Sequence, residues 1–321
     1  MTKLIIQIPC HNEEQALPVT LSELPRELPG VDLVEWLVVD DGSNDRTVEV
    51  AKANGVDHIV ELPSHQGLAR AFVAGLEAAV QAGADIVVNT DADNQYPADE
   101  IGKLVAPILE GRAEVVIGAR SMDQIEHFSP TKKVLQRLGS WVVRLVSRSD
   151  IPDAASGFRA MSRRAAMQTH VFSEYTYTLE TIIQAGQKGM AITSVPVRVN
   201  KNLRPSRLVK SIPSYIRHQG LTIIRIFMTY RSFRFFFVPG LALFGVGFLI
   251  GLRFVYFYVI DAGAGHVQSL ILASLLMGTG SFLCVVGLLA DLISVNRRLL
   301  ERVDWRLREL EEKIKNDKGA Q

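Results

Sequence analysis

Residues 85–97 read DIVVNTDADNQYP, a short apolar run that ends in a cluster of acidic and amide side chains. The run Asp85–Asn89 is almost continuously apolar, which is typical of a strand buried inside a parallel sheet. Asp91 and Asp93 follow it, so two carboxylates one residue apart can point at the same ion, and Gln95 could add a neutral oxygen. Oxygen ligands of this kind suit Mg²⁺ or Mn²⁺. The alternative is a simple turn that leads into a helix.

Strand-like runs alternate with helical patterns over the first 120 residues. The other runs are Leu4–Ile8, Trp36–Val39, His58–Leu62 and Val115–Ile117. Capping residues, Pro at a start and Gly after an end predict helices from Asn44 or Asp45 to Gly55, from Gln66 to Ala82 and from Pro97 to Gly111. This alternation predicts an α/β domain with a mostly parallel sheet. Ligands of such sheets bind at the carboxyl ends of the strands, where the acidic cluster lies.

A second acidic cluster, Asp40-Asp41-Gly42-Ser43, follows the strand Trp36–Val39. Its carboxylates could accept hydrogen bonds from a base or a ribose, although Asp41-Gly42 also fits an ordinary turn. The chain contains neither the P-loop pattern G-x-x-x-x-G-K-[ST] nor G-x-G-x-x-G between a strand and a helix. P-loop enzymes and dehydrogenases of the Rossmann type are therefore disfavoured.

Charge and hydropathy divide the chain of 321 residues unevenly. Residues 1–180 carry 26 acidic and 16 basic side chains, whereas residues 181–260 carry eleven basic and no acidic ones. A hydrophobic content of 48% suggests that part of the chain lies in lipid. Two cysteines, Cys10 and Cys284, allow no disulfide framework or zinc site, as expected in a reducing compartment. The N-terminus does not resemble a signal peptide.

Two apolar runs predict a pair of transmembrane helices within residues 233–295. Phe235–Leu252 is uncharged and its apolar character resumes after Arg253, while Leu270–Ala290 is uncharged throughout. About 20 apolar residues cross a bilayer, so both runs qualify, and a pair of buried core helices is the alternative. Arginines flank the outer ends of the pair but not the intervening loop, which places both termini in the cytoplasm.

Two further segments flank this pair. The basic stretch 201–232 mixes Lys and Arg with apolar residues and predicts amphipathic helices on an anionic membrane surface rather than a nucleic-acid interface. The tail 296–321 is predicted to be a cytoplasmic helix. Its apolar residues recur at heptad spacing, which suggests a homo-oligomer: Leu300, Val303, Leu307, Leu310 and Ile314.

Five motifs occur in a recognisable order along the chain: Ile8-Pro9-Cys10-His11-Asn12-Glu13-Glu14, Val38-Val39-Asp40-Asp41-Gly42-Ser43, Asp91-Ala92-Asp93-Asn94-Gln95-Tyr96-Pro97, Ile117-Gly118-Ala119-Arg120 and Ser156-Gly157-Phe158-Arg159. With them the chain resembles family 2 glycosyltransferases, and in particular the dolichol-phosphate mannose synthase and polyprenyl-phosphate glycosyltransferase group. The resemblance spans about Lys3 to Leu208. It implies a GT-A domain, Rossmann-like with a mostly parallel sheet, over residues 1–200.

The resemblance also implies roles for individual residues. The nucleotide donor would contact Pro9, His11, Glu13, Val39, Asp41, Asp91 and Ala92. The metal would be held by Asp91, Asp93 and Gln95. Residues that act on the reacting phosphates would be Asp93, Arg120, Arg204 and Arg207, and the lipid phosphate would meet Arg120 and Lys132 or Lys133.

The implied reaction is a metal-dependent, inverting transfer of a sugar from a nucleotide sugar to a polyprenyl phosphate, undecaprenyl or dolichyl. Such a phosphate has a second pKa of about 6, so it is already ionised at neutral pH and needs no strong base. His11 and Asn94 depart from the Tyr and Leu that are usual in the family, which puts the donor base in question. Transfer to another membrane lipid such as diacylglycerol, or a non-catalytic membrane scaffold, are the alternatives.

Overall fold

The structure is a computed structural model that describes residues 1–120, 151–171, 177–200, 224–225, 228, 230–261 and 267–319. It divides into two compact units, Met1–Gln219 and Gly220–Gln321, which are described separately. Several predicted residues lie outside the described part of the chain, namely Lys132, Lys133, Arg204, Arg207 and most of the basic stretch 201–232.

The first unit is built on one sheet whose described strands follow the order β3-β2-β1-β4-β6-β5-β7. All neighbours pair in parallel except β6, which runs antiparallel to both β4 and β5, so the predicted mostly parallel sheet is confirmed. The strands are β1 (Lys3–Cys10), β2 (Leu33–Asp40), β3 (His58–Glu61), β4 (Ile86–Asn89), β5 (Val115–Arg120), β6 (Arg159–Ser162) and β7 (Ile192–Val197).

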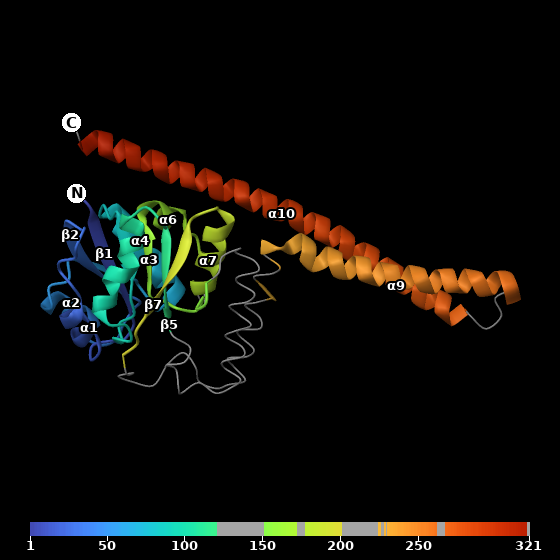
Figure 1. Ribbon diagram of the computed structural model, residues 1–321, viewed down its shortest axis with the longest axis horizontal. Coiled ribbons are helices and arrows are strands. Elements are labelled where there is room, and N and C mark those ends of the chain that lie inside the picture. Colours follow the sequence, from blue (N-terminus) through green and yellow to red (C-terminus); the bar gives the residue numbers. More distant parts are fainter. Residues whose placement is uncertain are drawn as a thin grey trace. The chain divides into compact units, whose positions relative to one another are not determined.

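Helices cover both faces of this sheet (Figure 1). One face packs against α1 (Leu17–Glu23), α2 (Thr47–Ala53) and α4 (Ile101–Leu109) through a core that includes Ile6 and Val38. The other face packs against α3 (Leu68–Gln81), α6 (Arg163–Gln168) and α7 (Thr178–Gln187). Because β1 is covered on both sides, its residues from Leu4 to Cys10 are all buried.

The three predicted helices are present with slightly shorter bounds. The residue that caps α2 is Arg46 rather than the predicted Asn44 or Asp45, although Asp45 Oδ1, one position earlier, accepts a hydrogen bond of 3.0 Å from the Thr47 amide. The third helix begins as a 3-10 turn, η1 (Ala98–Glu100), because Pro97 keeps an extended backbone conformation before it. The predicted fold is therefore confirmed, whereas β6 and β7 were not predicted as strands.

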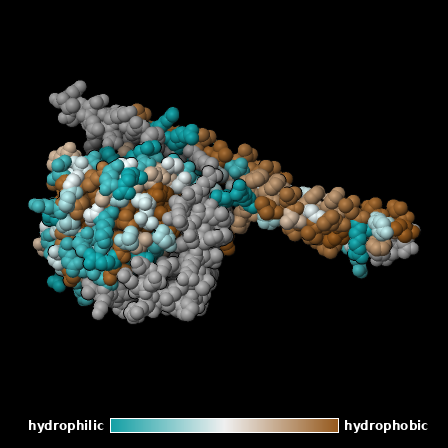
Figure 2. Space-filling view, viewed as in Figure 1, coloured by the Kyte–Doolittle hydropathy of each residue, from teal (hydrophilic) through white to brown (hydrophobic). Residues whose placement is uncertain are grey.

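The second unit contains two long helices, α9 (Ser232–Asp261) and α10 (Val267–Gly319). Within them, Ser232–Ile260 and Val267–Arg297 are long and apolar enough to cross a membrane, and hydrophobic residues cover both in Figure 2. α10 does not stop where its apolar part ends. It continues as one helix through the predicted tail.

Glycines let α9 and α10 approach closely. A Cβ added at Gly280 would lie 2.5 Å from the Phe244 amide nitrogen, and one added at Gly240 would lie 2.9 Å from the Gly280 carbonyl oxygen. A Cβ at Gly278, two residues away on α10, would meet nothing within 4 Å. Small residues at a helix crossing are the usual way in which apolar helices pack together without a hydrophobic driving force.

Gly280→Ala is therefore expected to destabilise the helical hairpin by about 1–3 kcal/mol, because the added methyl forces the two backbones apart. Gly278→Ala is the matched control and should be neutral or slightly stabilising, since alanine favours the helix. Unfolding of the full chain in mixed micelles with increasing denaturing detergent measures both. Equal midpoints for the two variants would show that the close crossing does not stabilise the hairpin.

Candidate active site

The predicted donor residues gather at one edge of the sheet. β1 and β2 end in register at Cys10 and Asp40, and β4 ends beside them at Asn89, paired with Gln7. The loops that follow these three neighbouring strands carry His11 to Glu13, Asp41 to Ser43 and Asp91 to Gln95. Parallel strands thus bring the two acidic clusters to the same edge, as the sequence predicted.

Asp91, Ala92 and Asp93 form a tight turn after β4. Ala92 is buried and its carbonyl accepts a hydrogen bond of 2.8 Å from Thr20 Oγ1, which anchors the turn to α1. Asp93 Oδ1 accepts a hydrogen bond of 3.1 Å from the Gln95 amide. Asn94 adopts a φ of +56°, a conformation that asparagine tolerates better than most residues. The turn fixes the backbone so that both carboxylates belong to one small acidic site.

Burial and the neighbouring charge of Asp93 raise the pKa of Asp91 to about 6, although Arg120 and Arg159 oppose the shift. Two carboxylates that repel one another in a poorly solvated place are stabilised by a cation between them. With the Gln95 side chain nearby in the sequence, the donor set consists of oxygen atoms only. These residues therefore fit a hard divalent cation such as Mg²⁺ or Mn²⁺.

The raised pKa gives a prediction for the protein stripped of metal. A carboxyl whose pKa is raised on folding stabilises the folded state at low pH and loses that contribution as pH rises from about 4 to about 6. Asp91→Asn should therefore melt higher than the wild type at pH 7 in the presence of a chelator, and the difference should shrink towards pH 4.5. Thermal unfolding of both chains at the two pH values measures it. A difference that is independent of pH would contradict the shift.

Arg120, the predicted phosphate contact, is held by a carboxylate that sequence reasoning missed. Its Nε and Nη2 donate to Asp153 Oδ2 at 2.7 Å and Oδ1 at 3.1 Å. Burial opposes the charge of the arginine, but Tyr96 and Asp153 outweigh it and raise the pKa of Arg120 above its ordinary value. The side chain of Asp153 is 2% exposed and that of Arg120 is 13% exposed. The pair fixes a permanent positive charge close to Asp91.

A buried polar network lies behind the acidic turn. Asn89 Nδ2 donates to the Gly157 carbonyl at 2.9 Å and to the Tyr177 hydroxyl at 3.0 Å, and Gln7 Nε2 donates to Asn89 Oδ1 at 2.9 Å. The Tyr177 ring stacks on Phe72 with centroids 3.8 Å apart. The sequence signal for this network was the presence of two amide side chains, Gln7 and Asn89, inside otherwise apolar strands.

Arg159 is entirely buried beneath this network, at the start of β6. Its Nη1 donates to the Thr178 carbonyl at 3.2 Å and to the Thr181 hydroxyl, and its Nη2 donates to the Ser156 carbonyl. Burial lowers the pKa of Arg159, and its charge in turn favours the ionised form of Asp91. The motif Ser156-Gly157-Phe158-Arg159 therefore supports the acidic turn from below.

Gly157 passes so close to Asp91 that no side chain fits between them. A Cβ there would lie 2.9 Å from the Tyr177 hydroxyl and 3.2 Å from Asp91 Oδ1. Gly157→Ala is expected to displace the carboxylate and to lower turnover by about 10- to 100-fold, the usual effect of disturbing groups that orient metal ligands.

Gly102→Ala on α4 is the control for this substitution, because its Cβ would meet only Leu28 Cδ1 at 3.9 Å and helix propensity favours alanine. Initial rates of the two variants, each compared with the wild type, decide the prediction. Wild-type rates for Gly157→Ala would show that the close approach has no bearing on the reaction.

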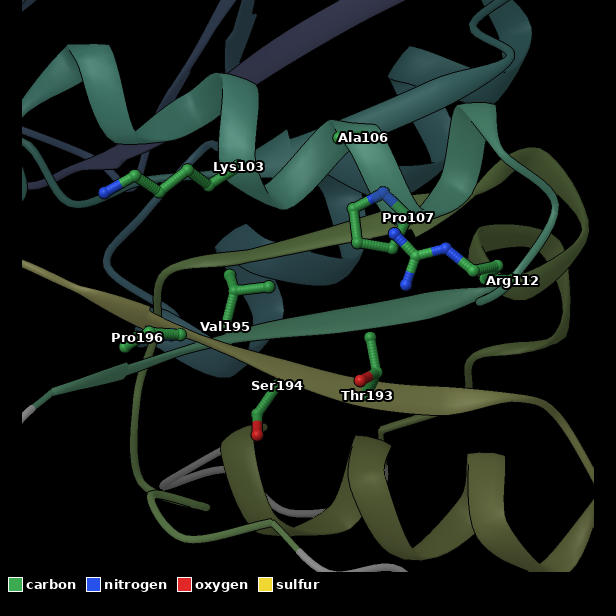
Figure 3. Close-up of a pocket in the computed structure, with 8 residues that line it drawn as sticks. All are labelled: Lys103, Ala106, Pro107, Arg112, Thr193, Ser194, Val195 and Pro196. Carbon is green, nitrogen blue, oxygen red and sulfur yellow. The ribbon is translucent and has the colours of Figure 1, made fainter.

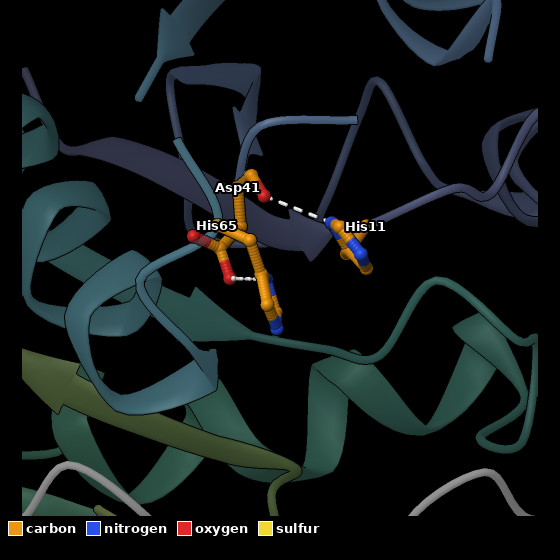
Figure 4. Close-up of side chains that lie close together, drawn as sticks. All are labelled: His11, Asp41 and His65. Carbon is orange, nitrogen blue, oxygen red and sulfur yellow. Dashed lines mark hydrogen bonds and ion pairs between the residues drawn. The ribbon is translucent and has the colours of Figure 1, made fainter. Parts of the chain in front are cut away.

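His11, Asp41 and His65 form the second part of the site (Figure 4). The two imidazoles stack with centroids 4.0 Å apart, and His11 Nδ1 lies 2.8 Å from the Asp41 carbonyl oxygen. The Asp41 carboxylate is buried and accepts from the amides of Gln66 and Gly67 at 2.7 and 2.8 Å and pairs with His65 Nδ1 at 2.8 Å. It thus holds the loop that leads into α3.

The ligand atoms of these three residues lie within 4.8 Å of one another, so the cluster could also hold a metal ion. Stacked rings, however, direct their nitrogen lone pairs along nearly parallel planes, and the carboxylate is already used by the loop. The His65 side chain is 58% exposed, so the stacked pair better suits a flat ligand such as a nucleobase, which can stack on an aromatic ring. His65 was not predicted as a site residue, because only the fold brings it to His11.

The other predicted donor contacts are less exposed. Pro9 and Val39 are buried in β1 and β2, and the Glu13 side chain is 8% exposed. Their contact with a nucleotide stays a prediction. Glu180 on α7 is also buried, at 8% exposure, so it is not an ordinary solvated surface group.

A separate open hollow of about 400 Å³ lies between α4 and β7 (Figure 3). Its two cations already have acidic partners, since Lys103 Nζ lies 2.6 Å from Glu100 and Arg112 pairs with Glu110. None of the predicted site residues lines it. The lining residues are Lys103, Ala106, Pro107, Arg112, Thr193, Ser194, Val195 and Pro196.

Comparison with known proteins agrees with this geometry. Residues 5–169 match the sequence family described as "Glycosyl transferase family 2". The chain is 26% identical over 217 residues to an undecaprenyl-phosphate mannosyltransferase of Micrococcus luteus, covering 64% of this chain and 87% of that one. It is 29% identical over 215 residues to a UDP-N-acetylglucosamine–dolichyl-phosphate N-acetylglucosaminyltransferase of Methanococcus voltae, covering 60% and 83%.

Among solved structures, glucosyl-3-phosphoglycerate synthase from Mycobacterium tuberculosis in complex with Mn²⁺, UDP-glucose and phosphoglyceric acid matches 69% of this chain and 79% of its own, with a TM-score of 0.52 and 23% identity. At this identity the likeness shows the fold alone. The fold is therefore GT-A-like, and the family match identifies the chain as a glycosyltransferase. Since the family match covers more than half of its residues, the chain belongs to glycosyl transferase family 2.

Proposed function

We propose that the protein transfers a sugar, with inversion, from a nucleotide-sugar donor to a polyprenyl phosphate and that the transfer depends on a divalent metal. The observation that carries the proposal is the acidic turn Asp91–Asp93, fixed at the carboxyl edge of the sheet beside the Arg120–Asp153 pair. Relatives named for transfer to undecaprenyl and dolichyl phosphates support the acceptor. The Mn²⁺ and UDP-glucose in the related structure support the metal and the donor type.

In this proposal, different residues of the chain act on the metal, the base and the phosphates. Asp91, Asp93 and Gln95 would hold a divalent cation, which would supply charge stabilisation at the leaving diphosphate. His11 and its stacked neighbour His65 offer a platform for the base. Arg120, fixed by Asp153, places positive charge where negative charge develops, and such preorganised charges need no rearrangement during the reaction.

Residues outside the described part of the chain complete this scheme. Arg204 and Arg207 would grip the donor phosphates, and Lys132 or Lys133 would meet the lipid phosphate. The acceptor phosphate is ionised at neutral pH, so it attacks the anomeric carbon directly while the nucleoside diphosphate leaves.

Insertion of the apolar helices in the membrane would keep the catalytic domain at the surface where a lipid acceptor lies. Residues 1–200 form the catalytic domain, 201–232 lie on the membrane surface, 233–295 cross the membrane twice and 296–321 return to the cytoplasm. Two helices of sufficient length and hydropathy support the two crossings. The catalytic domain and both termini are then cytoplasmic, where nucleotide sugars are available and a polyprenyl phosphate emerges from the inner leaflet.

The test uses the purified full chain in lipid nanodiscs with radiolabelled nucleotide sugars, Mg²⁺ or Mn²⁺, and either polyprenyl phosphate or diacylglycerol. The proposal expects a labelled lipid only with polyprenyl phosphate, and only when metal is present. A labelled product with diacylglycerol alone would show that the acceptor is diacylglycerol and not polyprenyl phosphate. No product from any donor, with protein that still melts cooperatively, would overturn the proposal.

A further inference from the structure

α10 is apolar on every side along its membrane-spanning part, since Ile271, Leu288 and Leu292 are exposed as well, and two of its rows lie on opposite sides of the helix. The first faces α9 and contains the small, buried residues Ala273, Gly280 and Gly287, which recur every seven positions, with Met277 and Cys284 between them. This row packs against α9, so its partner helix belongs to the same chain.

The second face, here named the outer seam, is exposed among the described residues. Its residues from Leu275 to Leu289 each lie two positions after a residue of the first row, as Leu289 follows Gly287. Two positions correspond to a rotation of about 200° around the helix axis, so the outer seam faces away from α9. Its large apolar members are 48–70% exposed, with Thr279, Val286 and Asn296 at the intervening positions. They are Leu272, Leu275, Phe282, Leu289, Ile293, Leu300, Val303, Leu307 and Leu310.

The outer seam keeps one phase from Leu272 to Leu310, alternating steps of three and four residues. This spacing matches the a/d pattern of a coiled coil over more than five heptads, and in the tail the seam positions stand out as apolar among mostly charged neighbours. The sequence alone showed it only in the tail. Because α10 is continuous through Arg297, the tail repeat and the membrane repeat belong to one stripe on one helix.

We propose that the outer seam pairs in parallel with the outer seam of a second copy of this chain. The inference rests on the membrane insertion proposed above. Every copy inserted in one membrane points its α10 in the same direction, so two such helices that meet side by side along their length are parallel. The face that would meet the second copy is free of α9, which occupies the opposite side.

Membrane lipid alone cannot cover the outer seam, because the seam continues into the tail. Beyond the apolar span that ends at Arg297, Leu300 is 70% exposed and Val303, Leu307 and Leu310 are each 54% exposed. Outside the bilayer these side chains meet water. Burying leucine and valine side chains away from water is favourable, so four of them on each helix favour pairing.

Polar residues on and beside the outer seam fit the parallel arrangement. Asn296 occupies a seam position at the end of the apolar span, where its side chain can hydrogen-bond across a helix pair. In the sequence, Glu311 follows Arg306 by five residues, which is the g-to-e spacing that pairs opposite charges between parallel helices.

Cross-linking tests the proposal with one matched pair of variants in the full chain in nanodiscs. Leu307→Cys lies on the outer seam, and Arg302→Cys lies about 140° away on the same helix. Under mild oxidation Leu307→Cys should form at least tenfold more intermolecular disulfide than Arg302→Cys or the wild type, whose Cys10 is buried and whose Cys284 lies against α9. Equal yields in all three chains would overturn the proposal.

A second measurement covers the case in which the tail folds back on its own catalytic domain. The double variant Leu300→Glu/Leu307→Glu should shift the particle mass in nanodiscs from an assembly to a monomer, whereas Arg302→Glu should not. A monomeric wild type would overturn the pairing. Sugar transfer is assayed in the same samples, so an assembly without transfer would count against the proposed function and leave the outer seam standing.

Discussion

Asp91→Asn and Asp93→Asn are each expected to lower sugar transfer by about 10³-fold or more while the protein stays folded. The amide keeps the shape of each side chain but removes the charge that we propose holds the cation. A metal that stabilises a leaving diphosphate contributes several kcal/mol to the transition state, and each 1.4 kcal/mol is a factor of about ten in rate. The Ala92 carbonyl remains bonded to Thr20, so the turn itself keeps its anchor.

Asp99→Asn is the matched control for these two variants. Asp99 follows the same stretch of sequence, but its side chain is 65% exposed and pairs with Arg198 on the surface. Exposed ion pairs contribute little, so rate and melting temperature should stay near those of the wild type. Initial rates at saturating metal, with thermal unfolding of each variant, make the comparison. Wild-type rates for Asp93→Asn would show that Asp93 is not a metal ligand.

Much of this site follows from sequence because the signal is local. A buried strand that ends in Asp91-Ala92-Asp93 needs only a parallel sheet to place its carboxylates at the ligand edge, and the alternation of runs predicts that sheet. The two acidic clusters meet because β1, β2 and β4 are neighbours, as the structure confirms. The apolar runs of α9 and α10 are local signals in the same sense.

The parts that sequence reasoning missed depend on contacts between distant residues. β6 inserts antiparallel between β4 and β5, and its segment of four residues is too short for an alternating pattern to reveal it. Arg159 has a charged side chain that composition would place on the surface, yet the fold buries it under Asp91. The use of Asp41 by the loop into α3 likewise requires knowing that this loop returns to the end of β2.

Asp153→Asn is the second substitution with a large expected effect, and it acts through Arg120. Removing one member of a buried ion pair leaves the other charge uncompensated, which typically costs about 3–5 kcal/mol of folding free energy. The guanidinium also loses one of the two hydrogen bonds that fix its direction, because the amide nitrogen cannot accept, so transfer should fall by about 10- to 100-fold. Thermal unfolding and initial rates measure the two losses separately.

The double variant Arg120→Met/Asp153→Asn separates the two roles of the pair. With both charges gone, no buried charge is left unpaired, and the amide oxygen introduced at position 153 can still accept from the backbone amide that Asp153 now meets at 3.4 Å. Stability should therefore return towards the wild type, as it does when a buried ion pair is replaced as a unit. Transfer should not return, because the positive charge beside the acidic turn is missing. Recovery of both stability and rate would show that the pair serves the fold alone.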